Sequence, residues 1–139
     1  MNIDITLPFY GDVGYLKATV NSVLAQTDPR WRLVVVDDGY PDPEVSRWFG
    51  SLGDGRVTYL RNDENLGANR NFAKCLTLVE SEYFMVMGAD DLLHPTFVGH
   101  ILHVLDHHPE IRIIQPGVEV IDESGSVVMP LADRMKQRL

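Results

Sequence analysis

A continuously apolar segment, RLVVVD at residues 32–37, constrains the fold of this 139-residue chain more than any other feature. A strand with one solvent-exposed face alternates apolar and polar residues, whereas this segment has no polar residue between Leu33 and Val36. Such a run is typical of a strand that is covered on both faces in a parallel sheet. The sequence therefore predicts an α/β domain in which helices connect parallel strands.

Strand-like and helix-like segments alternate along the rest of the chain. Asp12 stands where it can cap the first helix, and a final segment at 118–129 is typical of a hairpin that turns at Ser124-Gly125. This order predicts a doubly wound, mostly parallel sheet with helices on both faces. We expect strands at 2–8, 32–37, 56–60, 83–88 and 111–116, and helices at 13–26, 44–52, 67–79 and 95–107.

The composition fits one globular domain and argues against several classes of protein. The chain is 45% hydrophobic and 23% charged, and its net charge of -8 argues against nucleic-acid binding, which normally needs a basic surface. It has no apolar run of 18 residues, so no transmembrane segment is expected. The single cysteine, Cys75, cannot form an intrachain disulfide, which favours a reducing, cytoplasmic setting. We expect the domain to cover 1–129 and a polar tail to follow at 130–139.

Two pairs of neighbouring acids stand at the carboxyl ends of predicted strands, Asp37-Asp38 and Asp90-Asp91. In doubly wound sheets, ligands bind outside the carboxyl ends of the strands. Adjacent carboxylates repel each other unless a cation or a hydroxyl-rich ligand lies between them, and Mg²⁺ or Mn²⁺ takes oxygen ligands. The alternative is that Asp90 or Asp91 caps the helix at 95–107. By themselves, these residues leave both interpretations open.

The segment NLGANRN, at 65–71, adds a second group of candidates. Asp38 could accept hydrogen bonds from the N–H groups of a base or a sugar. Gly67 is placed for a close approach, and Arg70 lies in the first turns of a helix, where its charge and the helix dipole favour an anion or a base carbonyl. The alternative for Arg70 is a surface arginine beside two capping asparagines.

Two other features have structural explanations. His100, His103 and His107 share one face of the predicted helix at 95–107, and apolar residues occupy its opposite face. A solvated polar face explains this spacing without a metal. Cys75 lies on the core-leaning side of its helix, so we expect it to pack in the core rather than to act as a nucleophile.

Five motifs follow one another along the chain: LPFYG, SVLAQT, VVVDDG, NLGANRN and GADDLLHP. In this order they resemble the nucleotide-sugar half of inverting GT-A glycosyltransferases of family 2, over roughly residues 3–129. The resemblance implies a nucleoside diphosphate sugar as donor, carried by UDP or dTDP, and a saccharide or lipid-linked acceptor. It also implies a divalent cofactor, Mn²⁺ or Mg²⁺, and a place in cell-surface polysaccharide biosynthesis.

The resemblance also implies where the nucleoside would lie. Its base and ribose would lie across the end of the first strand, at Pro8, Phe9 and Tyr10, with Asp38 and Arg70 facing the base. The family usually ends this strand in a sequence like P-T-Y-N, whereas this chain has P-F-Y-G.

The segment GADDLLHP matches the DxD-type motif of the family through Ala89, Asp90 and Asp91. The resemblance implies that Asp90 holds the ribose or the sugar and that Asp91 holds the metal bound to the diphosphate. Many members carry an acid where this chain has Gly88, so the ribose contacts are expected to differ here.

The resemblance implies no catalytic base within this chain. Inversion requires a carboxylate that takes the proton of the acceptor hydroxyl, and in this family it lies well beyond the DxD motif. No acid after Asp91 lies in a segment that resembles the acceptor loop, so we expect the general base beyond Leu139. The chain is then expected to be the donor half of a longer enzyme, which binds the donor but does not catalyse transfer by itself.

Two further expectations concern the surroundings of such a donor half. The apolar surface left by an absent acceptor half favours a homodimer. Peripheral association with the inner face of a membrane is a further expectation.

Two other classes of protein are alternatives. A non-catalytic module that binds nucleotide sugars would share the donor residues and lack the base. A receiver-like signalling domain would also bind Mg²⁺ through an acid pair, but that pair should follow the first strand, where this chain has Pro8.

Overall fold

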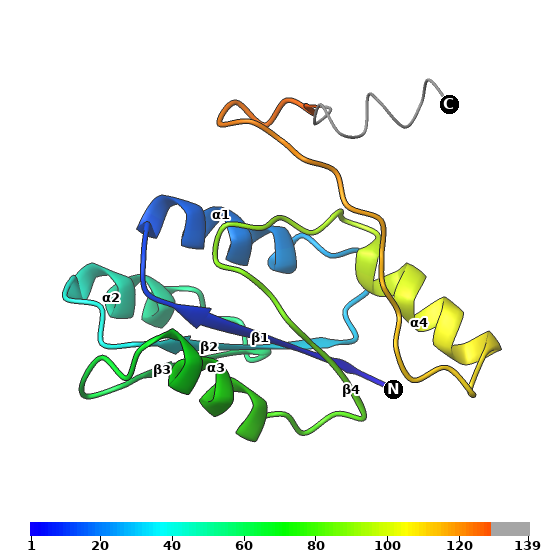
Figure 1. The fold of residues 1–139 in the computed structure, drawn as a ribbon, viewed down its shortest axis with the longest axis horizontal. Helices are drawn as coiled ribbons and strands as arrows, with labels where there is room; N and C mark the ends of the chain where they lie inside the picture. The colour runs from blue at the N-terminus through cyan, green and yellow to red at the C-terminus, as the bar shows by residue number, and fades with distance from the viewer. Residues whose placement is uncertain (129–139) are drawn as a thin grey trace. The chain divides into compact units, whose positions relative to one another are not determined.

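The computed structural model describes residues 1–128 and confirms the predicted alternation of strands and helices (Figure 1). The chain divides into two compact units, one at residues 1–109 and one that begins at Glu110. All regular strands and helices of the described residues belong to the first unit. They are β1 (Ile3–Phe9), α1 (Val13–Leu24), β2 (Trp31–Asp37), α2 (Pro43–Ser51), β3 (Val57–Arg61), α3 (Ala68–Thr77), β4 (Tyr83–Val86) and α4 (Phe97–His107).

The four strands form one parallel sheet in the order β3-β2-β1-β4. Figure 1 shows α1 and α2 on one face of this sheet and α3 on the other, so the doubly wound prediction is confirmed. The strand order also contradicts the receiver-like alternative, because a receiver places its first strand between the second and the third. Here β1 lies between β2 and β4.

The core explains why β2 is apolar at every central position. Leu33 and Val35 pack in the main hydrophobic cluster, which also contains residues of α1, α2 and α4. Val34 and Val36 point to the other face and pack in a smaller cluster with Cys75 of α3. Both faces of β2 are therefore covered, and Cys75 is confirmed as a core residue.

Two predicted elements after α4 have different outcomes. The strand predicted at 111–116 is wrong, since these residues form no strand and Ile113 exposes 88% of its surface. An alternation of apolar residues does not supply the neighbouring strand that backbone pairing requires. The hairpin is confirmed in short form, with an antiparallel bridge between Ile121 and Val127 and a turn at Gly125, which has a φ of 79°.

Two expectations fall outside the part of the chain that the structure describes. Residue 129 and the predicted polar tail at 130–139, with Leu139 as its last residue, lie outside the described residues. The general base expected beyond Leu139 also lies outside them and stays a prediction.

No helix within residues 1–128 is both long and apolar enough to cross a membrane.

Candidate functional site

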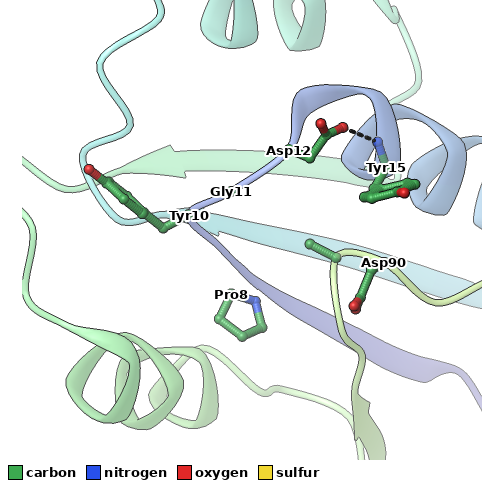
Figure 2. Close-up of a pocket in the computed structure, with 7 residues that line it drawn as sticks. Pro8, Tyr10, Gly11, Asp12, Tyr15 and Asp90 are labelled. Carbon is green, nitrogen blue, oxygen red and sulfur yellow. Dashed lines mark hydrogen bonds between the residues drawn. The ribbon is translucent and has the colours of Figure 1, made fainter.

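A pocket of about 310 Å³ opens where the carboxyl ends of β1 and β4 meet (Figure 2). Parallel pairing of β1 with β4 brings together two motifs that are far apart in the sequence. Four of the predicted site residues, Pro8, Tyr10, Ala89 and Asp90, line this one pocket. The complete lining is Pro8, Tyr10, Gly11, Asp12, Tyr15, Ala89 and Asp90.

Three residues of the lining, Gly11, Asp12 and Tyr15, were not predicted as site residues. Asp12 caps α1, as expected, by accepting a 2.9 Å hydrogen bond from the backbone N–H of Tyr15 (Figure 2). The tyrosine side chain is 53% exposed at the pocket. Gly11 ends the LPFYG motif, and Asp12 and Tyr15 belong to the helix start that directly follows it. Their position in or next to that motif is the signal that could have indicated them.

Phe9 and Tyr10 have opposite environments at the end of β1. The side chain of Phe9 is only 1% exposed and packs against the ring of Tyr40, with the ring centroids 5.2 Å apart. Its carbonyl oxygen accepts a 2.8 Å hydrogen bond from the N–H of Asp38. Tyr10 is 56% exposed. A ligand in the pocket could therefore reach the ring of Tyr10, whereas Phe9 supports the strand end from the core.

The carboxylates of Asp90 and Asp91 lie in the exposed turn that follows β4. An added Cβ at Gly88 would stand 2.8 Å from an oxygen of each carboxylate, so both acids fold back toward the same side of this glycine. Neither carboxylate has a hydrogen-bond or ion-pair partner within residues 1–128. The capping alternative is wrong, because α4 begins at Phe97 and its N-cap residue is Thr96.

This pair of carboxylates fits one kind of metal site and not another. Residues 1–128 contain no group of three or more His, Cys, Asp or Glu side chains that could hold a metal ion. A closed zinc site needs four protein ligands, but Mg²⁺ or Mn²⁺ needs only one or two carboxylates when phosphate oxygens complete its coordination. Asp90 and Asp91 therefore fit a hard cation that binds together with a diphosphate.

Asp38 is 2% exposed, and its carboxylate organises the loop before α3. One oxygen accepts hydrogen bonds from the side chain of Asn62 and from the N–H of Leu66, each 2.8 Å long. The other oxygen accepts a 2.9 Å bond from the N–H of Gly67. Asp38 thus fixes the start of α3 through backbone contacts, and a contact with a base stays a prediction.

A buried polar network, which the sequence analysis did not identify, extends from Asp38 into α3. Asn62 donates to Asn71 over 2.9 Å and accepts a 2.6 Å bond from the amine of Lys74. Asn71 in turn donates to the carbonyl of Val36 at the end of β2. Buried polar groups need such partners, so this network holds α3 in place on the sheet. Asn62 follows β3, and Asn71 lies in α3. Nothing in the sequence at either position indicates that the side chain is buried.

Gly67 and Arg70 stand at the start of α3 and outside the residues that line the pocket. Gly67 has a φ of +83°, and an added Cβ would meet no heavy atom within 4 Å. Glycine is therefore needed for its backbone conformation, and a close approach of a ligand to Gly67 stays a prediction. Arg70 is exposed and makes no hydrogen bond or ion pair within residues 1–128, so its guanidinium is available to a ligand.

The histidines of α4 lie on its solvent-exposed side. His100, His103 and His107 are all exposed, and the rings of the last two are 4.2 Å apart. Val98, Leu102 and Leu105 bury the opposite side. This arrangement agrees with the predicted solvated polar face.

Solved structures with the same fold include TarS and a mannosyltransferase. The crystal structure of residues 1–349 of TarS from S. aureus superposes with a TM-score of 0.70 and 20% identity, over 78% of this chain and 33% of that chain. TarS has also been solved in complex with UDP-GlcNAc. The mannosyltransferase PcManGT from Pyrobaculum calidifontis, in complex with GDP-Man and Mn²⁺, gives a TM-score of 0.58 and 22% identity over 66% of this chain and 28% of that chain. The fold is thus that of the GT-A glycosyltransferases.

The sequence match defines the family. The model of glycosyl transferase family 2 matches residues 4–135, so the chain belongs to this family. An uncharacterized glycosyltransferase of Rickettsia conorii is 33% identical over 128 residues, which cover 89% of this chain and 20% of that protein. The putative glycosyltransferase EpsE of Bacillus subtilis is 22% identical, over 88% of this chain and 45% of EpsE. The chain spans about a fifth of the length of the first curated relatives that it matches.

Proposed function

We propose that this chain is the donor-binding part of a glycosyltransferase that transfers a sugar from a nucleoside diphosphate sugar, with inversion, to a saccharide or lipid-linked acceptor. One observation carries the proposal: the pocket unites Pro8 and Tyr10 at the end of β1 with Ala89 and Asp90 at the end of β4. Membership of glycosyl transferase family 2 supports the reaction class. A general base beyond Leu139, cell-surface polysaccharide biosynthesis, a cytoplasmic location, membrane association and a homodimer stay predictions of the sequence.

The nucleoside contacts follow from which side chains are free. Tyr10 offers an exposed ring for stacking, and Arg70 offers a guanidinium without a protein partner within residues 1–128. Asp38 has its carboxylate occupied by the loop at 62–67, so its main contribution is to hold that loop and the start of α3. A base carbonyl facing Arg70 suits UDP or dTDP.

Asp91, together with Asp90, would hold the divalent cation. When bound, that cation would neutralise charge on the diphosphate leaving group. The two carboxylates suit this role because they are exposed and have no partner within residues 1–128. They are also folded toward the same side of Gly88. Asp90 also lines the pocket and is therefore placed to meet the ribose or the sugar of the donor.

The proposal is tested by calorimetric titration of the chain with UDP, with and without Mn²⁺, for the wild type and for Asp91→Ala. Metal-dependent binding in the wild type, weakened at least about tenfold in the variant, is the expected result. Asp106→Ala is the matched control, because Asp106 is an exposed acid on α4 and should leave binding unchanged. Absence of binding by UDP, dTDP and GDP in the wild type would refute the proposal.

A further inference from the structure

Three polar residues, one in the last turn of α1 and two just after it, hold the segment that follows the acid pair. Ser22, Gln26 and Thr27 belong to the SVLAQT motif, for which the donor contacts give no explanation. Their bonding partners lie 68 to 72 residues further along the chain, at 93–98. All of these bonds reach backbone atoms of that segment, so they fix its path whatever its side chains are.

Gln26 makes the most specific of these contacts. It is 8% exposed, and its amide nitrogen donates to the carbonyl of His94 over 2.8 Å and to that of Ser22 over 3.1 Å. Its amide oxygen accepts a 2.9 Å bond from the N–H of Val98 at the start of α4. Both ends of a buried amide are therefore satisfied, which allows only one orientation of the side chain.

Ser22 and Thr27 make further hydrogen bonds to the segment at 93–98. The hydroxyl of Ser22 accepts a 3.1 Å bond from the N–H of Leu93, two residues after Asp91. Thr27 donates to the carbonyl of Pro95 through its backbone N–H, over 2.9 Å, and through its hydroxyl, over 3.2 Å.

The acid pair lies in a short segment that is tied at both ends. Before it, the N–H of Met87 donates a 2.9 Å bond to the carbonyl of Thr6 in β1. After it, Leu93 bonds to Ser22. Between these two points the only bond within residues 1–128 is a 3.4 Å contact from the N–H of Asp91 to the carbonyl of Gly88. The position of both carboxylates therefore depends on the two attachments.

We propose that Gln26, assisted by Ser22 and Thr27, is a positioning residue for the loop that carries Asp90 and Asp91. It touches neither the donor nor the cation, and it acts by fixing the chain into which the acid-pair turn leads. This inference rests on the proposed function for its consequence, which is metal-dependent donor binding. The ordering of the loop itself does not depend on the identity of the ligand.

The test compares Gln26→Leu with Val23→Ala in the complete chain. Val23 is a fully buried residue of α1, three residues before Gln26, and makes no hydrogen bond to 93–98, so its variant controls for a general loss of stability. We expect Gln26→Leu to weaken UDP binding in the presence of Mn²⁺ by at least about tenfold, with binding in the absence of metal unchanged. Val23→Ala should leave UDP binding unchanged both with and without Mn²⁺.

Hydrogen–deuterium exchange of the unliganded protein gives the second readout. Exchange at residues 88–98 should become faster in Gln26→Leu and stay at the wild-type rate in Val23→Ala. Equal exchange in both variants would overturn the inference, as would equal metal-dependent affinities. If Gln26→Leu does not fold, Ser22→Ala replaces it, with the same expected direction. A wild type that binds no nucleoside diphosphate would refute the proposed function. Hydrogen–deuterium exchange at residues 88–98 would then be the only test of whether Gln26 orders the loop.

Discussion

Asn62, the first residue after β3, donates a 2.8 Å hydrogen bond to the carboxylate of Asp38, the first residue after β2. Parallel pairing of the two strands brings these residues side by side, and both are buried. Because Asn62 also bonds to Asn71 and Lys74, it joins two strand ends to α3. The position of Arg70, in the first turn of α3, therefore depends on a buried side chain that does not line the pocket.

Replacement of Asn62 by alanine should lower the free energy of unfolding by about 2 kcal/mol, because buried partners lose their hydrogen bonds. Urea unfolding followed by circular dichroism measures the change. Asn69→Ala is the matched control, since Asn69 is exposed on α3 and its loss should cost no more than about 0.5 kcal/mol. Similar losses in the two variants would contradict a structural role of the network.

A partly buried ion pair at the other end of the sheet makes the free energy of unfolding depend on pH. Asp4 is fully buried, and its carboxylate lies 2.6 Å from the guanidinium of Arg32 and accepts bonds from the N–H groups of Glu80 and Ser81. Burial alone would raise the pKa of Asp4, but the bonds from Arg32, Glu80 and Ser81 together lower it well below its usual range. The folded protein therefore binds the Asp4 proton less readily than the unfolded chain.

Asp4→Asn should lower the free energy of unfolding at neutral pH by about 3 kcal/mol, because it removes the buried carboxylate and leaves Arg32 only its exposed ion pair with Glu80. The contribution of Asp4 to the free energy of unfolding is fully present above the pKa of its carboxyl group in the unfolded chain, about 3.9. It is lost as the pH falls through the lower pKa of this group in the folded protein. Urea unfolding across that range should therefore show the difference between wild type and variant shrinking below about pH 4. Glu44→Gln breaks the exposed pair with Lys17 and should cost less than about 1 kcal/mol. A difference that is constant with pH would contradict this origin.

Gly88→Ala should impair metal-dependent binding more than folding. The new Cβ would stand 2.8 Å from oxygens of Asp90 and Asp91, and these side chains can rotate away at little cost in stability. UDP titration with Mn²⁺ should show affinity at least about tenfold weaker than the wild type, with an unchanged unfolding midpoint. Gly50→Ala lies in α2, where an added Cβ meets nothing within 4 Å, and should leave binding unchanged. Wild-type affinity in Gly88→Ala would show that the observed carboxylate geometry is not needed.

Cys75 should react slowly with a thiol reagent in the native protein. Its side chain is fully buried between β2 and α3, and burial raises its pKa to about 11, so little thiolate forms at neutral pH. Reaction with Ellman's reagent at about pH 8 should proceed only as the protein unfolds, and urea should restore the rate of a free thiol. Fast reaction of the folded protein would show that α3 opens readily.

Local patterns in the sequence determined the class of fold and part of the candidate site. The apolar run of β2 required cover on both faces, and helix-like segments between the strands required parallel pairing. Together these features place strand ends on one edge of the sheet, which is why the acid pairs were candidates for a site there. Pro8, Tyr10 and Ala89 were expected to join Asp90 only because the motifs resemble those of family 2 glycosyltransferases. Each inference used residues that are neighbours in the chain or in one element.

Tertiary structure decided what depended on partners distant in the sequence. The pairing of Gln26 with His94 and Val98, and of Asn62 with Asp38, joins residues that carry no local signal for each other. The apolar segment at 111–116 has the pattern of a strand, yet it forms none in the described structure. A side chain's type limits which hydrogen bonds it can make, but only the folded chain decides which partner lies within about 3 Å of it.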